Sequence, residues 1–301
     1  MKVVYPNACI WEKDYILTDI LKNQCEALYF DITQNSINSL CSQKDLTNNC
    51  IFVTTGLIRE NVNIHIIERI KPKVVIYLSD ETTSRPNLYN CIKANCRAFI
   101  YCYHYSLYDT NKSNLTMLQM PLGYVSGYLQ HCNNLSENNQ LKPMKDREYN
   151  CSFVGVIKSD RQEMFDVFSA NMDKSYFSTT GDTHGFQIGK LNVSPDNLYK
   201  IYSDSVFVLN GRGYRSLDCF RIYEAIVAGA IPVIVGKKEE LDMTFKYDGY
   251  SFKFVSAESW TDALATCKQL LENKDELQSM QDYNRQWWLD KLNSMNNIIC
   301  N

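Results

Sequence analysis

Short apolar runs alternate with amphipathic segments along almost the whole chain. In the first half, the runs that we expect to form strands are Lys2–Tyr5, Ala27–Asp31, Cys50–Thr54, Lys73–Leu78, Ala98–Tyr103 and Met117–Met120. Helical patterns lie between them, near Lys13–Gln24, Ile37–Lys44, Ile64–Ile70 and Asn87–Asn95. Because short β-branched runs that alternate with helices are typical of βαβ units, this half is predicted to be a Rossmann-like α/β layer structure.

The second half repeats this alternation. Its expected strands are Asn150–Val156, Ser175–Ser178, Ser205–Leu209, Ile231–Val235 and Ser251–Val255. Its expected helices are Asp160–Asn171, Asp196–Tyr202, Asp218–Ala228, Ser259–Glu272 and Lys274–Asn296. A polar, Asn-rich stretch from Gln130 to Arg147 separates the halves and has the composition of a linker, although a long surface loop within one domain would look the same. We therefore predict two domains, residues 1–145 and 146–301.

Composition narrows the classes of function. The chain has 31 basic and 34 acidic residues and a formal net charge of −3, so no broad basic field is available for nucleic acid. No run reaches the roughly 20 apolar residues that a membrane-spanning helix needs, and no signal peptide is predicted. The twelve cysteines form no C-x-x-C pair and no zinc-like cluster, so reduced, mostly buried thiols are expected. These features predict a soluble, cytoplasmic protein whose oligomeric state stays open.

The most informative segment runs from Ser205 to Gly236. A buried strand leads into Asn210-Gly211-Arg212-Gly213, where the glycines permit a close approach of the backbone. Ser216 or Asp218 is placed to cap the helix that follows.

On that helix, Arg221 and Glu224 are three residues apart and are therefore neighbours on its surface. A glycine-bearing loop before a helix N-terminus can bind an anion, because free N–H groups and the helix dipole point at the ligand. Arg221 and Arg212 could then neutralise a diphosphate, while Glu224 could accept hydrogen bonds from a ribose diol. The alternative is that Arg221 and Glu224 form a solvated ion pair worth at most ~1 kcal/mol.

The string from Arg221 to Ile234, RIYEAIVAGAIPVI, resembles the C-terminal signature of the exostosin family of glycosyltransferases. The strand and glycine loop of residues 202–213 also look like that family, as does the segment Cys151–Gly155 followed by Arg161. The resemblance covers roughly residues 150–272. One departure is Cys219, where the family often has a hydroxyl residue two positions before the arginine.

The resemblance implies a GT-B fold, with two Rossmann-like domains facing a central cleft and a C-terminal helix bracing back on the N-terminal domain. It also implies inverting transfer from a UDP-sugar donor to a glycan hydroxyl, with no required cofactor and no metal ion. Carried over by position, Arg221 would contact the diphosphate and Glu224 the ribose. Gly155 and Arg161 would line the phosphate side, and Asn210, Gly211, Arg212 and Ser216 belong to the same predicted donor site.

An inverting transfer needs a base that takes the proton of the acceptor hydroxyl. Asp80 and Glu81 follow a predicted strand of the N-terminal, acceptor-binding domain, at the end where α/β ligand sites gather. Either carboxylate could instead cap the next helix. His104, which follows another strand, is the rival base, although a lone histidine among tyrosines is more often a packed residue.

Several alternatives stay open. UDP-xylose is one candidate donor, suggested by relatives, beside other UDP-pentoses and UDP-hexoses. The chain could also be a catalytically inactive scaffold that acts as an interaction protein, or another nucleotide-sugar enzyme with the same architecture. A microbial or viral source, with activity in the host cytoplasm in the viral case, would suit a chain so rich in asparagine.

Overall fold

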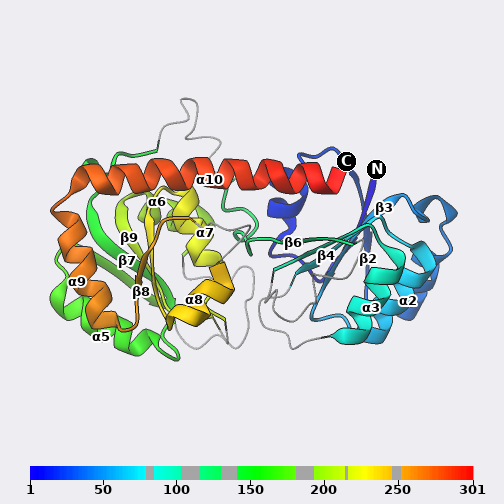
Figure 1. Cartoon of the computed structure of the whole chain (residues 1–301), viewed down its shortest axis with the longest axis horizontal. Coiled ribbons are helices and arrows are strands. Elements are labelled where there is room, and N and C mark those ends of the chain that lie inside the picture. The colour runs from blue at the N-terminus through cyan, green and yellow to red at the C-terminus, as the bar shows by residue number, and fades with distance from the viewer. Residues whose placement is uncertain are drawn as a thin grey trace. The chain divides into compact units, whose positions relative to one another are not determined.

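The computed structural model describes residues 1–78, 85–102, 115–129, 141–180, 193–213, 216–245 and 252–300. The chain divides into two compact units. The first comprises Met1–Leu122 with Lys291–Asn301, and the second comprises Gly123–Asp290. Each is built around a parallel β-sheet (Figure 1). The mixed α/β architecture predicted from the alternation of apolar runs is therefore confirmed.

The predicted domain boundary, between residues 145 and 146, lies inside the second unit. Most of the polar stretch that suggested a linker, residues 130–140, lies outside the described residues. The part that is described, from residue 141 on, packs in the second unit. There Arg147 is buried and Gln281 donates a hydrogen bond of 3.1 Å to the Lys142 carbonyl. A polar composition did not reveal these contacts, because they join residues far apart in the sequence.

The first unit holds a sheet in the order β2-β1-β3-β4-β5-β6, with parallel pairing throughout. The strands are β1 (Lys2–Pro6), β2 (Glu26–Phe30), β3 (Cys50–Thr55), β4 (Val74–Leu78), β5 (Ala98–Tyr101) and β6 (Thr116–Gln119). Strands β3 and β4 are buried at every position, which explains why they are continuous apolar runs rather than alternating ones.

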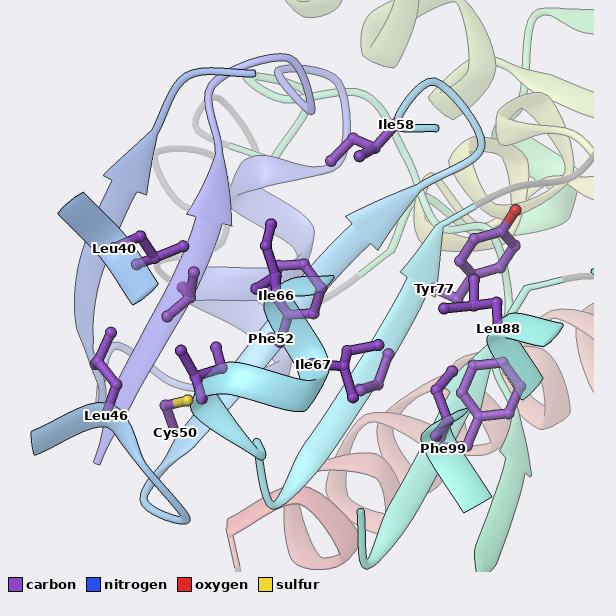
Figure 2. Packing of buried hydrophobic residues seen from close by; sticks show 14 of the residues in the cluster. Leu40, Leu46, Cys50, Phe52, Ile58, Ile66, Ile67, Tyr77, Leu88 and Phe99 are labelled. Atoms are coloured by element: carbon purple, nitrogen blue, oxygen red, sulfur yellow. The ribbon is translucent and has the colours of Figure 1, made fainter. Parts of the chain in front are cut away.

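One face of this sheet packs against helices and a short turn. These are α1 (Gln34–Cys41), η2 (Lys44–Leu46), α2 (Glu60–Ile70) and α3 (Pro86–Asn95). Figure 2 shows the shared core, in which Phe52 of β3 and Phe99 of β5 lie with Ile66 and Ile67 of α2. Isoleucines recur on α2 at helical spacing, so a single apolar stripe faces the strands.

A π-helix, η1 (Tyr15–Ile20), and the last residues of the C-terminal helix α10 (Lys274–Cys300) also belong to the first unit. Tyr15 of η1 donates a hydrogen bond of 3.2 Å to the Pro121 carbonyl, and Asn296 of α10 donates one of 2.7 Å to the Ile20 carbonyl. Met295 and Ile299 are buried. The end of α10 is therefore anchored in the first unit, although the helix begins in the second.

The second unit holds a parallel sheet in the order β11-β10-β9-β7-β8. Its strands are β7 (Tyr149–Val156), β8 (Ser175–Thr180), β9 (Ser205–Asn210), β10 (Ile231–Val235) and β11 (Val255–Ala257). Its helices are η5 (Met144–Asp146), α5 (Arg161–Asn171), α6 (Pro195–Ser203), α7 (Phe220–Val227), α8 (Lys238–Phe245), α9 (Trp260–Leu271) and the first part of α10. Phe153, Phe168, Phe207 and Trp260 are fully buried within its core.

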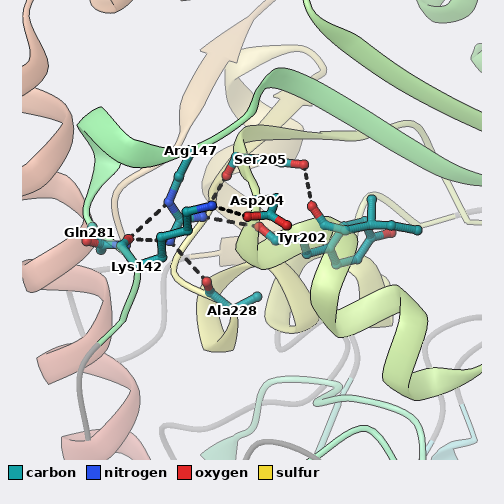
Figure 3. A network of polar contacts seen from close by, with 8 residues as sticks. Lys142, Arg147, Tyr202, Asp204, Ser205, Ala228 and Gln281 are labelled. Atoms are coloured by element: carbon teal, nitrogen blue, oxygen red, sulfur yellow. Dashed lines mark hydrogen bonds and ion pairs between the residues drawn. The ribbon is translucent and has the colours of Figure 1, made fainter. Parts of the chain in front are cut away.

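Arg147 ties several elements of the second unit together. Its guanidinium donates hydrogen bonds to the carbonyls of Tyr202, Ser205 and Ala228, at 3.1, 2.6 and 3.1 Å, and also to the Lys142 carbonyl (Figure 3). Burial lowers the pKa of this guanidinium to about 10, which still leaves it charged near neutral pH. The network fixes the end of α6 and the end of α7 against β9.

Within the described part of the chain, no helix is both long and apolar enough to cross a membrane. Of the eleven described cysteines, Cys9, Cys50, Cys102, Cys151 and Cys267 are buried and the other six are partly buried, so the expectation of mostly buried thiols holds only in part.

Candidate functional site

The loop between β9 and α7 and the first turn of α7 form the centre of the candidate site. Strand β9 ends at Asn210, and α7 begins at Phe220 after Cys219, which has an extended backbone. The expected capping by Ser216 or Asp218 is wrong, because Cys219 occupies the N-cap position and its side chain makes no capping hydrogen bond. Ser216 is buried, and its hydroxyl instead accepts a hydrogen bond of 3.0 Å from the Asp218 N–H.

Arg221, on the first turn of α7, is held by several neighbours. Its Nε donates to the Val154 carbonyl at 3.3 Å, and its guanidinium lies over the Phe153 ring, 4.9 Å from the ring centroid. Its Nη1 lies 3.6 Å from the sulfur of Cys219, and its side chain also hydrogen-bonds Tyr202. Arg221 is thus a positioned cation, fixed by β7 on one side and α6 on the other.

Gly155 provides the space that Arg221 occupies. A Cβ built on Gly155 would lie 2.7 Å from Nη2 of Arg221 and 3.4 Å from the Phe153 ring. Any larger residue at this position would have to push the guanidinium away. Gly155, which was predicted to line the phosphate side, therefore bears on the position of Arg221.

Arg161, the other arginine expected near the phosphates, is turned inward. Its guanidinium donates to the Arg212 carbonyl through Nε and Nη2, at 2.9 and 2.5 Å, and to the Val156 carbonyl at 3.0 Å. Burial first, and then the nearby charge of Arg221, lower its pKa to about 10. Gly211 lets the loop come this close, because a Cβ there would lie 2.5 Å from Cγ of Arg161. Arg161 therefore holds the glycine loop in place through the Arg212 carbonyl.

Arg212 is paired within the protein. Its guanidinium forms a two-pronged ion pair with Glu240 of α8, and both side chains are about 30% exposed. The backbone N–H of Arg212 donates to a carboxylate oxygen of Asp160 at 3.0 Å. Burial raises the pKa of Asp160, although this hydrogen bond and the neighbouring arginines oppose the effect.

Glu224 is one turn beyond Arg221 and is only 4% exposed, so the two residues are not the solvated surface pair that was the alternative. Burial raises the pKa of Glu224 to about 7, against the opposing effects of Arg221 and of a hydrogen bond from the Val125 N–H. The Tyr128 hydroxyl donates to the backbone carbonyl of Glu224 at 2.7 Å, which fixes this turn of α7.

Asn210 is buried at the end of β9 and connects the loop to the N-cap. Its amide donates to the Leu217 carbonyl at 3.3 Å, and its oxygen accepts from the Cys219 thiol at 2.7 Å. The thiol that replaces the family's hydroxyl therefore still makes a polar contact, within the protein.

The structure brings together, in the second unit, the predicted residues Gly155, Arg161, Asn210, Gly211, Arg212, Ser216, Arg221 and Glu224. The three predicted catalytic candidates, Asp80, Glu81 and His104, lie outside the described residues.

Four residues that hold the site's arginines or loop were not predicted from the sequence: Phe153, Tyr202, Asp160 and Glu240. Asp160 could have been singled out, because it is an acidic residue at the predicted start of a helix. Tyr202 and Glu240 could not, because each contacts its arginine only once the chain has folded.

In the described part of the chain, no group of three or more His, Cys, Asp or Glu residues is placed to hold a metal ion. The positioned groups that could meet a ligand are the Arg221 guanidinium and the Glu224 carboxyl, whose pKa burial raises to about 7. Such a set suits an anionic ligand that also carries hydroxyls.

Comparison with solved structures identifies the fold. Anabaena Alr3699/HepE in complex with UDP-glucose is similar over 100% of this chain and 98% of that chain, with a TM-score of 0.59 and 8% identity. The same protein in complex with UDP and glucose gives a TM-score of 0.58 at 9% identity over the same shares of the two chains. At such identity the likeness concerns the fold alone, and the predicted GT-B fold with two Rossmann-like domains is confirmed.

No curated protein matches the chain in sequence. The family model described as the RXYLT1 C-terminal domain matches residues 130–289, which is more than half of the chain and includes every predicted donor-site residue. The chain therefore belongs to the exostosin-like glycosyltransferase family defined by the RXYLT1 C-terminal domain, which confirms the resemblance noted from the sequence.

Proposed function

We propose that this protein is a glycosyltransferase that takes a sugar from a UDP-sugar and transfers it, with inversion and without a metal ion, to a hydroxyl of a glycan. The observation that carries the proposal is the positioned guanidinium of Arg221 beside the buried carboxyl of Glu224, at the start of α7. The Anabaena protein of the same fold binds UDP-glucose, which supports a uridine nucleotide as the ligand here.

In the proposed reaction, an acceptor oxygen attacks the anomeric carbon while the bond from that carbon to the diphosphate breaks. Negative charge then develops on the departing UDP. A fixed guanidinium stabilises this charge more in the transition state than in the ground state, because it needs no reorganisation as the charge forms. Arg221 takes this role, while Glu224 accepts hydrogen bonds from the ribose hydroxyls.

The remaining donor-site residues act as supports in this proposal. Gly155 gives Arg221 its space, Asn210 holds the N-cap, and Arg161 holds the glycine loop through its carbonyl. The second unit would bind the donor and the first unit the acceptor. UDP-xylose is the first donor to try, followed by other UDP-pentoses and UDP-hexoses.

The test is a calorimetric titration of the full chain with UDP, GDP and a panel of UDP-sugars, repeated in EDTA. We expect selective binding of UDP that is unchanged by EDTA. Arg221→Ala should weaken UDP binding by about 100-fold or more, since one charge-assisted contact is worth about 1.5–3 kcal/mol and in this proposal Arg221 would make two with the diphosphate. Arg69→Ala, which removes an exposed arginine of α2, is the matched control and should bind UDP normally. Absence of UDP binding to the unaltered protein would refute the proposal and favour an inactive scaffold.

A further inference from the structure

Glu224 lies on a short helix, so contacts from other segments fix the place of its carboxyl. Helix α7 has eight residues, Phe220–Val227, and Ala228 follows as its C-cap. A helix of about two turns is not stable by itself, because most of the stability of short helices comes from tertiary packing. Within the helix, the Glu224 carbonyl accepts a hydrogen bond of 3.1 Å from the Ala228 N–H. Beyond that bond, the position of this turn depends on the residues packed around it.

Two separate segments of the second unit hold the carbonyls at this end of α7. Arg147 donates to the Ala228 carbonyl at 3.1 Å, four residues beyond Glu224. The Tyr128 hydroxyl donates to the Glu224 carbonyl at 2.7 Å, and both residues are buried. Of these two contacts, that of Tyr128 is made at the residue that carries the carboxyl.

The Tyr128 side chain is itself fixed by its surroundings. It is fully buried, its ring lies edge-to-face against Tyr199 of α6 with the centroids 5.7 Å apart, and the Tyr124 ring is 6.1 Å away. A hydrogen bond of 3.1 Å from the Tyr128 N–H to the Val125 carbonyl closes a turn in its backbone. Gly127 in this turn has a φ of +88°, which residues with a Cβ rarely adopt. The hydroxyl therefore has a set direction before any ligand arrives.

The same turn also contacts the carboxyl of Glu224, through the hydrogen bond from the Val125 N–H. Glu224 is thus held at its carbonyl by Tyr128 and at its carboxyl by Val125, from two residues three positions apart in the chain. A carboxylate has two oxygens and about four lone-pair positions, so one N–H donor leaves it able to accept from two hydroxyls. A ribose diol supplies two hydroxyls, whereas 2′-deoxyribose lacks one of them.

We propose that Tyr128 is a positioning residue of the donor site, which holds Glu224 where its carboxyl accepts from the 2′-hydroxyl of a ribonucleotide. Tyr128 does not touch the ligand in this arrangement and acts through Glu224. The inference rests on the proposed function and deepens it, because it names a residue that sets the preference of the donor site for a ribonucleotide over a 2′-deoxyribonucleotide.

The test compares the binding of UDP and 2′-deoxy-UDP to the full chain by calorimetry at pH 8, above the pKa of Glu224. The unaltered protein should prefer UDP by about tenfold or more, which is the effect of one hydrogen bond to a charged group. Tyr128→Phe keeps the ring and removes only the hydroxyl, and it should lower this preference to about threefold or less. Tyr283→Phe removes an exposed hydroxyl of α10, keeps the ring that faces Lys253, and is the matched control that should leave the preference unchanged.

A double-mutant cycle separates positioning from a role in the fold. Glu224→Ala removes the carboxyl but keeps the backbone carbonyl to which Tyr128 donates. Because Tyr128 acts through the carboxyl in this proposal, Tyr128→Phe should change UDP affinity by less than about twofold in the Glu224→Ala background. An equal loss of UDP affinity in both backgrounds would mean that the hydroxyl serves the fold and would overturn the inference, as would an unchanged preference for UDP in Tyr128→Phe.

The behaviour of the unaltered protein distinguishes this inference from the proposed function. Failure to bind either nucleotide would count against the proposed function itself. Binding of UDP and 2′-deoxy-UDP with equal affinity would leave the use of a UDP-sugar standing, but it would overturn the contact between Glu224 and the 2′-hydroxyl and, with it, the role of Tyr128.

Discussion

The two parallel sheets of this protein differ in the side chains that follow their strands. In the second unit, Arg161 follows β7 and Arg212 follows β9, and Arg221 donates to the Val154 carbonyl of β7. In the first unit, the loop after β1 carries the partly exposed Trp11 and Glu12, and the Lys13 ammonium lies over the Tyr29 ring of β2. Guanidinium groups therefore gather after the strands of the second unit, whereas aromatic rings and charges of both signs follow β1 in the first.

The arginines of the second unit are preorganised. They are held by backbone carbonyls, a carboxylate or an aromatic ring, so their positions are set before any ligand arrives. Buried polar atoms without a hydrogen-bond partner among the described residues occur in both units, at the Tyr5 hydroxyl of the first and at the Ser203 hydroxyl and the Trp260 indole N–H of the second. The units therefore differ in their fixed charges, and a preorganised charge can stabilise a leaving group.

The largest effect should come from removing the arginine that supports the second unit. Arg147→Met leaves several buried carbonyls without their shared donor, and each unsatisfied group costs about 1–3 kcal/mol. We expect the free energy of unfolding to fall by about 3 kcal/mol or more, as measured by urea unfolding. Lys142→Met removes the half-exposed ion pair with Asp204 in the same network and should change it by less than about 1 kcal/mol (Figure 3). Equal losses in the two variants would contradict this contrast.

A pH-dependent effect should follow from Glu224. Its pKa in the folded protein is about 7, above the usual 4.5 of a glutamate side chain, so the folded state binds more protons between these values. The contribution to stability is therefore fully present below about pH 4.5 and is lost as the pH rises through 7, by roughly 3 kcal/mol in total.

Glu224→Gln removes this titration. The stability of the variant relative to the unaltered protein should thus rise by about 3 kcal/mol between pH 4.5 and pH 8, as measured by urea unfolding at several pH values. A constant difference across this range would show that the Glu224 carboxyl is not held near neutrality by burial.

Gly155→Ala should weaken both folding and ligand binding. The new methyl would displace Nη2 of Arg221, and the φ of +154° at Gly155 is one that residues with a Cβ rarely adopt, so Tm should fall. The affinity for UDP should fall about tenfold, or about 1.4 kcal/mol, because the guanidinium loses its position. Gly211→Ala, in which the methyl instead meets the stem of buried Arg161, should lower Tm as well. Unchanged UDP affinity in Gly155→Ala would remove Arg221 from the donor site.

The sequence predicted the elements that depend on local pattern. The glycine loop, the helix with Arg221 and Glu224, and the strand from Ile231 were visible as apolar runs and turn residues, and they form as expected. The start of α7 was less accurate, since Ser216 and Asp218 are both good capping residues and neither is the N-cap. Capping propensity ranks the residues that can occupy an N-cap position. It does not decide which of several nearby residues does so when tertiary contacts hold the loop.

The direction of each long side chain could not be predicted. Arg161 and Arg221 have similar positions at the starts of two helices, yet one is engaged with loop carbonyls and the other lies over Phe153. What separates them is the space above Gly155 and the approach of Gly211, which exist only once β7 and β9 are paired. The same holds for Tyr5, because nothing in an apolar first strand indicates a hydroxyl left without a partner.

The smallest expected effect concerns the pairing of Arg212 with Glu240. This ion pair is partly exposed, so Glu240→Gln should change the free energy of unfolding by less than about 1 kcal/mol. It should nevertheless release the guanidinium of Arg212 for the phosphates and raise UDP affinity a few-fold, most clearly at low salt, where charge interactions are least screened. Glu239→Gln, the exposed neighbour on α8, is the matched control and should leave UDP affinity unchanged. A drop in UDP affinity in Glu240→Gln would instead show that the ion pair between Arg212 and Glu240 is needed to hold the loop. Arg212 would then be a support for the loop, like Arg161, and Arg221 would be the cation that meets the diphosphate.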